Sequence, residues 1–192
     1  MATQVVSPPA EGVSVHRFSA DDYHKMGEVG ILGPELRSEL LDGVIYDLSP
    51  PGPLHSDNTD ELVERWILAL RGRARVRGQN PLALAQDGEP RPDIVLLRRR
   101  RYRDHNPTPA DVLLIMEVTD TTVAHDLQLK ALRYAQAGIP EYWVYLVRTP
   151  ELVVHREPSA EGYKSITRHG PGQPVSPLAV PDVSFDLAEL AD

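Results

Sequence analysis

Three acidic residues and one lysine could together carry out metal-assisted hydrolysis: Glu39, Asp93, Glu117 and Lys130. Asp93 follows a proline at the start of an apolar run, and Glu117 lies near the end of a longer apolar run. A carboxylate in such a run is costly to desolvate unless a positive charge or a hydrogen-bond donor meets it. Two acids that converge on neighbouring strands would repel each other, and a bound divalent cation is one common way to relieve that repulsion.

The residue types available limit the metal that such a site could hold. The chain contains no cysteine, so disulfides and thiolate metal sites are excluded, and any metal must use carboxylate or imidazole ligands. Hard oxygen ligands favour Mg²⁺ or Mn²⁺ over Zn²⁺. Such a cation lowers the pKa of a bound water and neutralises charge on a scissile phosphate. A lysine beside the cation can orient that water or stabilise the charge that develops on the phosphate.

Each of the four residues also has a purely structural interpretation. Glu39 could be an exposed hairpin charge, Asp93 could cap a turn, and Glu117 could pair with an arginine. Lys130 lies four residues after Asp126, and an ion pair at that spacing stabilises a helix by only ~0.2–0.5 kcal/mol. These alternatives stay open from the residues alone.

Further candidates surround this set. His55 follows a stiff proline loop and could approach a substrate phosphate or form a capping bond, and Gln79 could line a cleft. Asp126 and Tyr134 are candidates to support the lysine, although a tyrosine at this position more often belongs to a core. The only dense basic patch is the run Arg98, Arg99, Arg100 and Arg101. Arginine suits phosphate recognition through its planar fork, and a solvated loop is the alternative for this run.

The elements that must position these residues are predicted from apolar spacing and turn residues. Helices are expected over 20–26 after the N-cap Ser19, over 55–71 and over 123–137. Strands are expected over 37–41, 44–48, 74–76, 82–85, 92–97, 111–118, 141–147, 151–156 and 162–167. The first two strands should form a hairpin, because Asp42-Gly43 between β-prone runs is a strong turn signal.

This order of elements predicts an α/β (α+β) fold with a mixed central sheet flanked by helices. A strand–helix–strand unit spans 112–147, a hairpin precedes it, and a meander follows it at the sheet edge. We expect a flexible arm over 1–15 and a single domain over 16–192. In the proline-rich tail, Val183 and Phe185 are expected to dock back onto the domain.

Length and charge narrow the function classes. The 192 residues carry a net charge of −8, from 28 acidic and 20 basic residues. This balance argues against a protein that coats DNA non-specifically, although an enzyme could meet DNA at one local basic strip. No run approaches the roughly 18 apolar residues of a membrane-spanning helix, so no membrane partner is expected. Without cysteines or a visible secretory signal, we expect a cytoplasmic protein.

Several motifs resemble those of a known superfamily. Pro92-Asp93, then Met116-Glu117-Val118, and then a helix bearing Lys130 resemble the PD-(D/E)XK nucleases. More closely, residues 16–190 resemble the bacterial Uma-two family of restriction-endonuclease-like proteins. The matching segments are ELLDGVIYDLSPPGPLH (39–55), QNPLAL (79–84), RPDIVLL (91–97), DVLLIMEVTDTT (111–122), DLQLKALRYAQAGIPEYW (126–143) and the terminal strands.

The resemblance implies a restriction-endonuclease-like fold and a role for each matched residue. Asp93 and Glu117 would be metal ligands, and Glu39 would hold a metal-bound water or a second metal. The superfamily lysine usually lies two residues after the second acid, where this chain has Thr119. The family resemblance implies that this lysine has moved onto the next helix, as Lys130. DNA is the implied partner, and duplex-cutting enzymes of this fold often act as homo-oligomers.

The leading hypothesis is therefore an Mg²⁺- or Mn²⁺-dependent nuclease acting on DNA. One alternative is a binding or regulatory module that keeps the nuclease fold without useful turnover. Another is a structural protein whose carboxylates form internal ion pairs. Under the leading hypothesis, the Lys130 ammonium should lie close to Asp93 and Glu117, and Lys130→Ala should reduce cleavage while leaving stability nearly unchanged. The sequence does not distinguish DNA from RNA.

Overall fold

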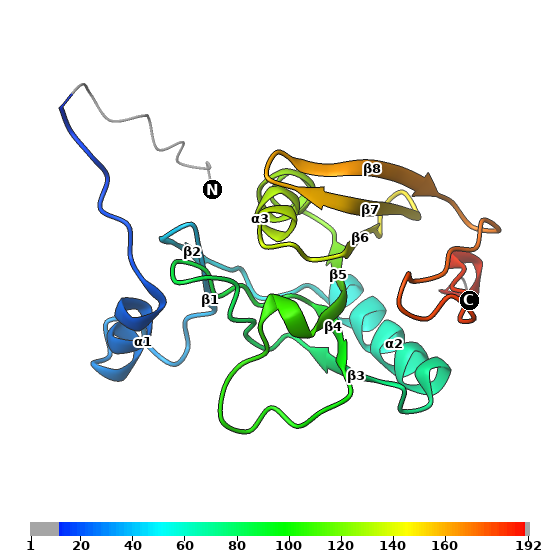
Figure 1. Ribbon diagram of the computed structural model, residues 1–192, viewed down its shortest axis with the longest axis horizontal. Helices are drawn as coiled ribbons and strands as arrows, with labels where there is room; N and C mark the ends of the chain where they lie inside the picture. Colours follow the sequence, from blue (N-terminus) through cyan, green and yellow to red (C-terminus); the bar gives the residue numbers. More distant parts are fainter. Residues whose placement is uncertain (1–11, 191–192) are drawn as a thin grey trace.

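A six-stranded mixed β-sheet forms the centre of the computed structural model, which describes residues 12–190 (Figure 1). The strands lie in the order β3-β4-β5-β6-β7-β8, and every neighbouring pair is antiparallel except β5 and β6. Their bounds are β3 (Ala74–Gly78), β4 (Ile94–Arg98), β5 (Val112–Thr119), β6 (Glu141–Leu146), β7 (Glu151–Ser159) and β8 (Gly162–His169). The parallel pair is the expected strand–helix–strand unit, and the mixed sheet confirms the predicted fold class.

Helices cover both faces of this sheet (Figure 1). On one face, α2 (Pro53–Leu70) buries Leu62, Trp66 and Leu70 at spacings of four residues. On the other face lies a continuous helix made of a π-helical segment, η2 (His125–Lys130), and α3 (Ala131–Gln136). The remaining helices are α1 (Ala20–Glu28), η1 (Pro109–Asp111) and η3 (Leu187–Leu190). Because both faces are covered, β5 and β6 are apolar along almost their whole length.

A separate hairpin of β1 (Ser38–Leu41) and β2 (Val44–Asp47) carries Glu39. Its turn residues Asp42 and Gly43 have φ of 55° and 66°, as a two-residue hairpin loop requires. Leu40 exchanges two backbone hydrogen bonds with Glu89, at 3.3 and 2.8 Å. This bridge docks the hairpin beside the segment that leads into β4, and all four residues of β1 are buried.

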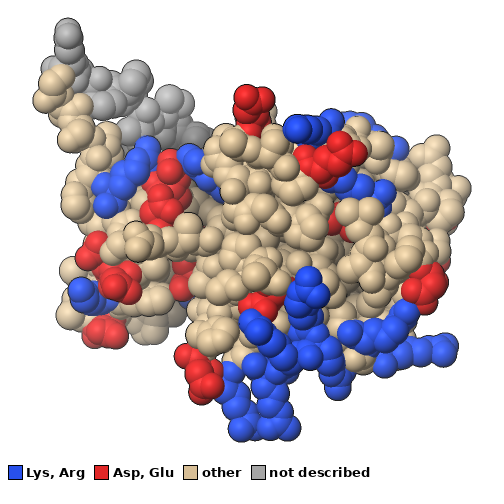
Figure 2. Space-filling view, viewed as in Figure 1, with Lys and Arg blue, Asp and Glu red and all other residues tan. Residues whose placement is uncertain are grey.

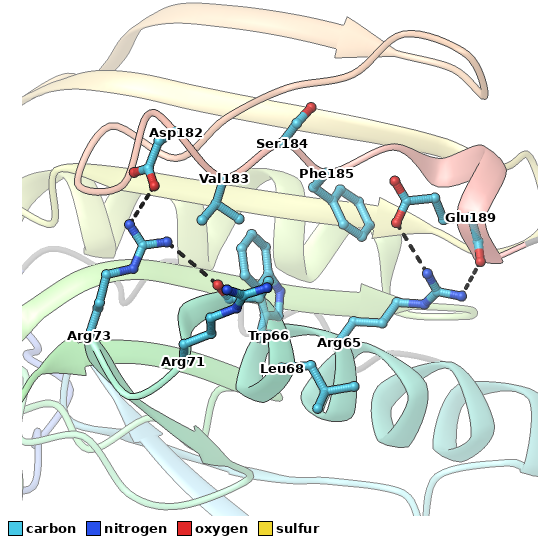
Figure 3. A pocket seen from close by; sticks show the side chains of 11 residues that line it. Arg65, Trp66, Leu68, Arg71, Arg73, Asp182, Val183, Ser184, Phe185 and Glu189 are labelled. Carbon is cyan, nitrogen blue, oxygen red and sulfur yellow. Dashed lines mark hydrogen bonds and ion pairs between the residues drawn. The ribbon is translucent and has the colours of Figure 1, made fainter.

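The C-terminal tail docks on the α2 side, as predicted. Val183 and Phe185 join the core around Trp66, whose ring centroid lies 5.7 Å from that of Phe185. The ion pair of Arg73 with Asp182 spans 2.6 Å at the rim of a cavity of about 710 Å³ (Figure 3). None of the candidate acids lines this cavity, which lies beside the C-terminal half of α2.

Two predictions about secondary structure need correction. No strand forms over 82–85, where the structure has only an isolated bridge between Ala85 and Gly88. The apolar residues there belong to a loop that buries Leu82, and its backbone amides donate to the carbonyls of Pro90 and Pro107 instead of to a strand. The helix expected over 123–137 does form, but it widens into the π-helical segment η2.

Two further predictions concern the N-terminal arm and membrane-spanning helices. The arm predicted over 1–15 lies mostly outside the described residues, and residues 12–15 are in neither a helix nor a strand. Across residues 12–190, no helix combines the length and the apolar character that crossing a bilayer requires.

A buried histidine in the meander should make stability depend on pH. His155 on β7 is 3% exposed, lies beside the Tyr142 and Tyr163 rings, and its Nδ1 donates to the Tyr142 carbonyl over 3.2 Å. Burial lowers the pKa of His155 below its ordinary 6.5. In the unfolded chain the same group keeps its ordinary pKa, so the unfolded state binds a proton that the native state resists.

We therefore expect the free energy of unfolding to fall as pH drops from about 6.5 to about 5, partly because of His155. His155→Gln should make this slope shallower in urea titrations across that range. His105→Gln, a change in an exposed loop, should keep the wild-type slope. Equal slopes in the wild type and His155→Gln would contradict the prediction.

Candidate active site

The two strand acids meet where β4 begins and β5 ends. The antiparallel register sets Ile94 opposite Met116, which brings the residues on either side, Asp93 and Glu117, together. The Asp93 amide donates to Glu117 Oε2 over 3.0 Å, and the Val118 amide donates to Asp93 Oδ2 over 3.0 Å. Asp93 therefore does more than cap a turn, because its backbone and side chain tie two strand ends together.

Lys130 reaches this point from the helix on the same face of the sheet. Its Nζ lies 3.1 Å from Glu117 Oε1, 3.4 Å from Glu39 Oε2 and 3.7 Å from Asp126 Oδ1. The residue is 5% exposed. Although burial lowers the pKa of Lys130, the surrounding carboxylates, with Glu117 first, raise it above its ordinary value. Lys130 is a buried cation shared by three acids, and an exposed i,i+4 pair with Asp126 does not describe it.

The π-helical segment η2 positions two residues of the site. Within it, the Ala131 amide donates to the Asp126 carbonyl, a bond that spans five residues. This wider turn begins at His125 and ends at Lys130, and both side chains contact Glu39. Regular α-helical geometry would place side chains five residues apart on different faces. The π-helical turn thus allows one helix to offer both groups to the same carboxylate.

Glu39 is fully buried, contrary to its interpretation as an exposed hairpin charge. His125 Nε2 lies 3.1 Å from Glu39 Oε1, and the Arg91 amide donates to Oε2 over 3.2 Å. Burial raises the pKa of Glu39, but the Lys130 charge and the hydrogen bonds from His125 and Arg91 lower it overall. His125 is a site residue that the sequence reasoning missed, because its spacing from Lys130 does not fit an α-helix.

The Asp93 carboxylate also accepts hydrogen bonds from the two polar candidates outside the strands, His55 and Gln79. His55 Nε2, from the first turn of α2, lies 3.0 Å from Asp93 Oδ2, and Gln79 Nε2 donates to Oδ1 over 3.2 Å. The hydrogen bond to Asp93 raises the pKa of His55 above 6.5. Burial raises the pKa of Asp93, but the hydrogen bond and charge of His55 keep it below its ordinary value overall. The other ring nitrogen, His55 Nδ1, is buried without a hydrogen-bond partner in the described residues.

Glu117 has the opposite electrostatic environment. Burial, together with the charges of Asp93, Asp126 and Glu39, raises its pKa well above 4.5 despite Lys130. The Tyr134 hydroxyl donates to Glu117 Oε1 over 3.1 Å, so this tyrosine is both a core residue and a support for the acid. The two neighbouring strand acids therefore differ: their surroundings lower the pKa of Asp93 and raise the pKa of Glu117.

Negative charge exceeds positive charge in this cluster. Four carboxyl groups lie around one ammonium, and the other ionisable partners are His55 and His125. The donors are hard oxygens, which fits Mg²⁺ or Mn²⁺ chemically. Within residues 12–190, however, no three His, Asp or Glu side chains are arranged as a ready metal site. The carboxylates point instead at Lys130, the histidines and backbone amides.

The arginine run is not brought to these acids. Arg98 ends β4, whereas Asp93 precedes its first residue, so an offset of five residue steps, or about 16 Å, separates them. Arg99, Arg100 and Arg101 follow in the loop and are exposed. A ligand bound at the carboxylates would reach this run only if it extended well beyond them.

A mixed sheet with two acids at adjacent strand ends and a lysine from the following helix defines a restriction-endonuclease-like fold. The family described as "Putative restriction endonuclease" (Uma2) matches residues 20–188, so the chain belongs to this family. A solved structure with this fold is described as a putative nuclease belonging to DUF820, from Anabaena variabilis. It is 16% identical, with a TM-score of 0.70 over 90% of this chain and 97% of that chain. No curated protein matches the chain.

The burial of Lys130 corrects the expectation that its replacement leaves stability nearly unchanged. In the presence of EDTA, Lys130→Met should lower the free energy of unfolding by about 3–5 kcal/mol, because it leaves buried carboxylates without their cation. The loss should be larger at about pH 8 than at about pH 5, where the carboxyl groups can take up protons.

Urea denaturation measures this loss, and Lys164→Met on the exposed side of β8 is the matched control, with a change within about 0.5 kcal/mol. Adding Glu117→Gln to Lys130→Met should recover part of the stability, because it removes one unpaired acid. If Lys130→Met is as mild as Lys164→Met, the shared ion-pair cluster does not stabilise the fold.

Proposed function

We propose that this protein is a metal-dependent nuclease that hydrolyses phosphodiester bonds in DNA. The position of Lys130 supports this most directly, because its ammonium lies within 3.4 Å of both Glu117 and Glu39. Thr119 occupies the usual lysine position of the superfamily pattern, and the next helix supplies a lysine to the same acids. A helix used only for packing gains nothing from burying an ammonium there, since burying an ion pair is often no better than apolar packing.

In this mechanism Asp93 and Glu117 would hold Mg²⁺ or Mn²⁺, and Glu39 would hold a water of that cation or a second cation. When bound, the cation supplies a water of lowered pKa and neutralises charge on the scissile phosphate. Asp93 is the more accessible of the two strand acids, with 12% of its side chain exposed against 3% for Glu117. The ligand set is therefore approached from the side of Asp93 and His55.

The other residues of the site orient and stabilise the reacting groups. Lys130 donates a hydrogen bond to the attacking water, and its charge stabilises the negative charge that develops on the phosphate. Tyr134 and the Asp93 amide fix the Glu117 carboxylate by hydrogen bonds at 3.1 and 3.0 Å. His55 is held by Asp93 through Nε2, while its Nδ1 is buried and has no hydrogen-bond partner in the described residues.

One observation favours a second candidate, a nuclease-fold module that binds without useful turnover. Both oxygens of Glu117 already accept hydrogen bonds inside the protein, from Lys130, Tyr134 and the Asp93 amide. In such a module the carboxylates would neutralise Lys130 permanently. Metal binding in calorimetry without cleavage of any nucleic acid would support this candidate over the nuclease.

The proposed function also implies a partner, a compartment and an oligomeric state. DNA in the cytoplasm is the expected partner. A homo-oligomer would allow two sites to cut the two strands of a duplex.

Incubation with mixed duplex and single-stranded DNA in Mg²⁺ or Mn²⁺ tests the proposal. The wild type should cleave, EDTA should abolish cleavage, and Asp93→Asn or Lys130→Ala should reduce the rate by roughly 10²-fold or more per folded molecule. Lys130→Arg should not restore the rate, because the guanidinium is broader and its charge is spread over a plane.

The matched control is Asp60→Asn, which changes an exposed acid on α2 and should leave the rate unaltered. Calorimetry with Mn²⁺ should show binding to the wild type and to Lys130→Ala, and weaker binding to Asp93→Asn. Cleavage that persists in Asp93→Asn would place the active site elsewhere.

A further inference from the structure

Two segments next to each other on the sheet form an arginine strip, residues 71–77 and 98–103. They contain nine arginines and no acidic residue, in a chain whose net charge is −8. The first segment leads into and runs along the edge strand β3, and the second leaves the end of β4. They meet where Arg75 Nη1 donates to the Arg100 carbonyl over 3.3 Å. Figure 2 shows Lys and Arg side chains gathered along the lower part of the molecule in that view.

The strand register places the β3 arginines of the strip, Arg75 and Arg77, on the same sheet face as the candidate active site, whereas Arg71 and Arg73 line the cavity on the α2 side. Arg77 pairs with Val95 and Arg75 pairs with Leu97, and directly paired residues share a face. Val95 and Leu97 belong to the core under α3, the face from which Tyr134 reaches Glu117. The arginines of β3 and the strand acids therefore face the same side.

Position along β3 sets the distance from the acids. Gln79, just after β3, is level with Asp93 and donates to its carboxylate. Arg77 is two residues back along the strand and Arg75 four, which at about 3.3 Å per residue gives steps of about 7 and 13 Å. The loop arginines 98–103 lie farther still. Along β3, the strip therefore begins at Arg77, about 7 Å from the level of the carboxylates, and extends away from them.

The charges of the strip are largely unpaired. Only Arg73 with Asp182 and Arg100 with Asp111 form ion pairs in the part of the chain that the structure describes. Burial and the neighbouring Arg75 charge lower the pKa of Arg77, as expected for like charges held side by side. Unpaired arginines on one line are suited to a polyanion with regularly spaced charges.

We infer that the arginine strip binds the phosphate backbone of a nucleic acid strand, from about two to four or more nucleotides to one side of the scissile bond. This count applies to a duplex whose axis runs along β3, because each strand then rises about 3.4 Å per nucleotide along that axis. The position of the scissile bond rests on the proposed function, but binding by the strip does not require metal. Arg75 and Arg77 carry the near part, and the 98–103 loop carries the far part.

The test measures binding in EDTA, so that cleavage plays no role. Fluorescence anisotropy with a labelled duplex of roughly 20 base pairs, and with one of its strands, gives affinity as a function of salt. Arg75→Gln/Arg77→Gln should bind at least about tenfold more weakly at low salt, and its log–log salt slope should fall by roughly 2. Lys164→Gln/Arg168→Gln removes the same charge from β8, at the opposite sheet edge, and should change affinity less than about twofold.

Each outcome decides the inference. The inference would be overturned if the two double variants lost DNA affinity equally. It would also be overturned if Arg75→Gln/Arg77→Gln kept the wild-type DNA affinity and the wild-type melting temperature. Tighter binding of the wild type to phosphatidylserine vesicles than to DNA would also overturn it, since the strip would then serve a lipid surface. Strip-dependent DNA binding without cleavage in Mg²⁺ would keep the inference and remove the proposed nuclease activity. Cleavage in Mg²⁺, together with DNA binding that does not depend on the strip, would keep the proposed nuclease activity and remove the inference.

Discussion

The burial of one ammonium constrains much of this fold. Lys130 lies among three carboxylates that come from β1, β5 and its own helix, and none of these groups can be buried without the others. The docking of the hairpin, the convergence of β4 with β5 and the π-helical turn all serve this meeting point. The separate two-stranded sheet, which a minimal core does not need, makes sense as the support that carries Glu39 inward.

The same cluster separates two adjacent acids by their environment. Asp93 collects hydrogen bonds from His55, Gln79 and a backbone amide, which favour its charge, whereas Glu117 lies deeper among other acids. Environments that push neighbouring pKa values apart are typical of sites that handle protons and charge. A cluster built only for stability would gain more from apolar packing, so the excess of buried acid is more readily explained by chemistry than by folding.

Much of this arrangement follows from local sequence signals, and the rest depends on long-range contacts. The hairpin at Asp42-Gly43, the amphipathic α2 and the apolar β5 were predictable because turn chemistry and periodicity act locally. The loop around Leu82 resembled a strand because a short apolar run can be buried by a loop as well as by a strand. The π-helical turn and His125 had no local signal, because tertiary contacts with Glu39 select that backbone. The depth of Lys130 was also missed, since spacing alone cannot show what covers a helix.

The arginine strip has a consequence for how the molecule moves before it binds anything. Nine of the twenty basic residues lie in the strip, so the rest of the chain holds the other eleven together with all 28 acidic residues. This separation of a charge of +9 in the strip from a charge of −17 in the rest of the chain gives the protein an electric dipole. Near a polyanion, the dipole orients the strip toward the polyanion, because the acidic residues of the rest of the chain are repelled. Productive encounters therefore become more frequent at low ionic strength. In solution without a polyanion, the strip of one copy attracts the net negative remainder of another.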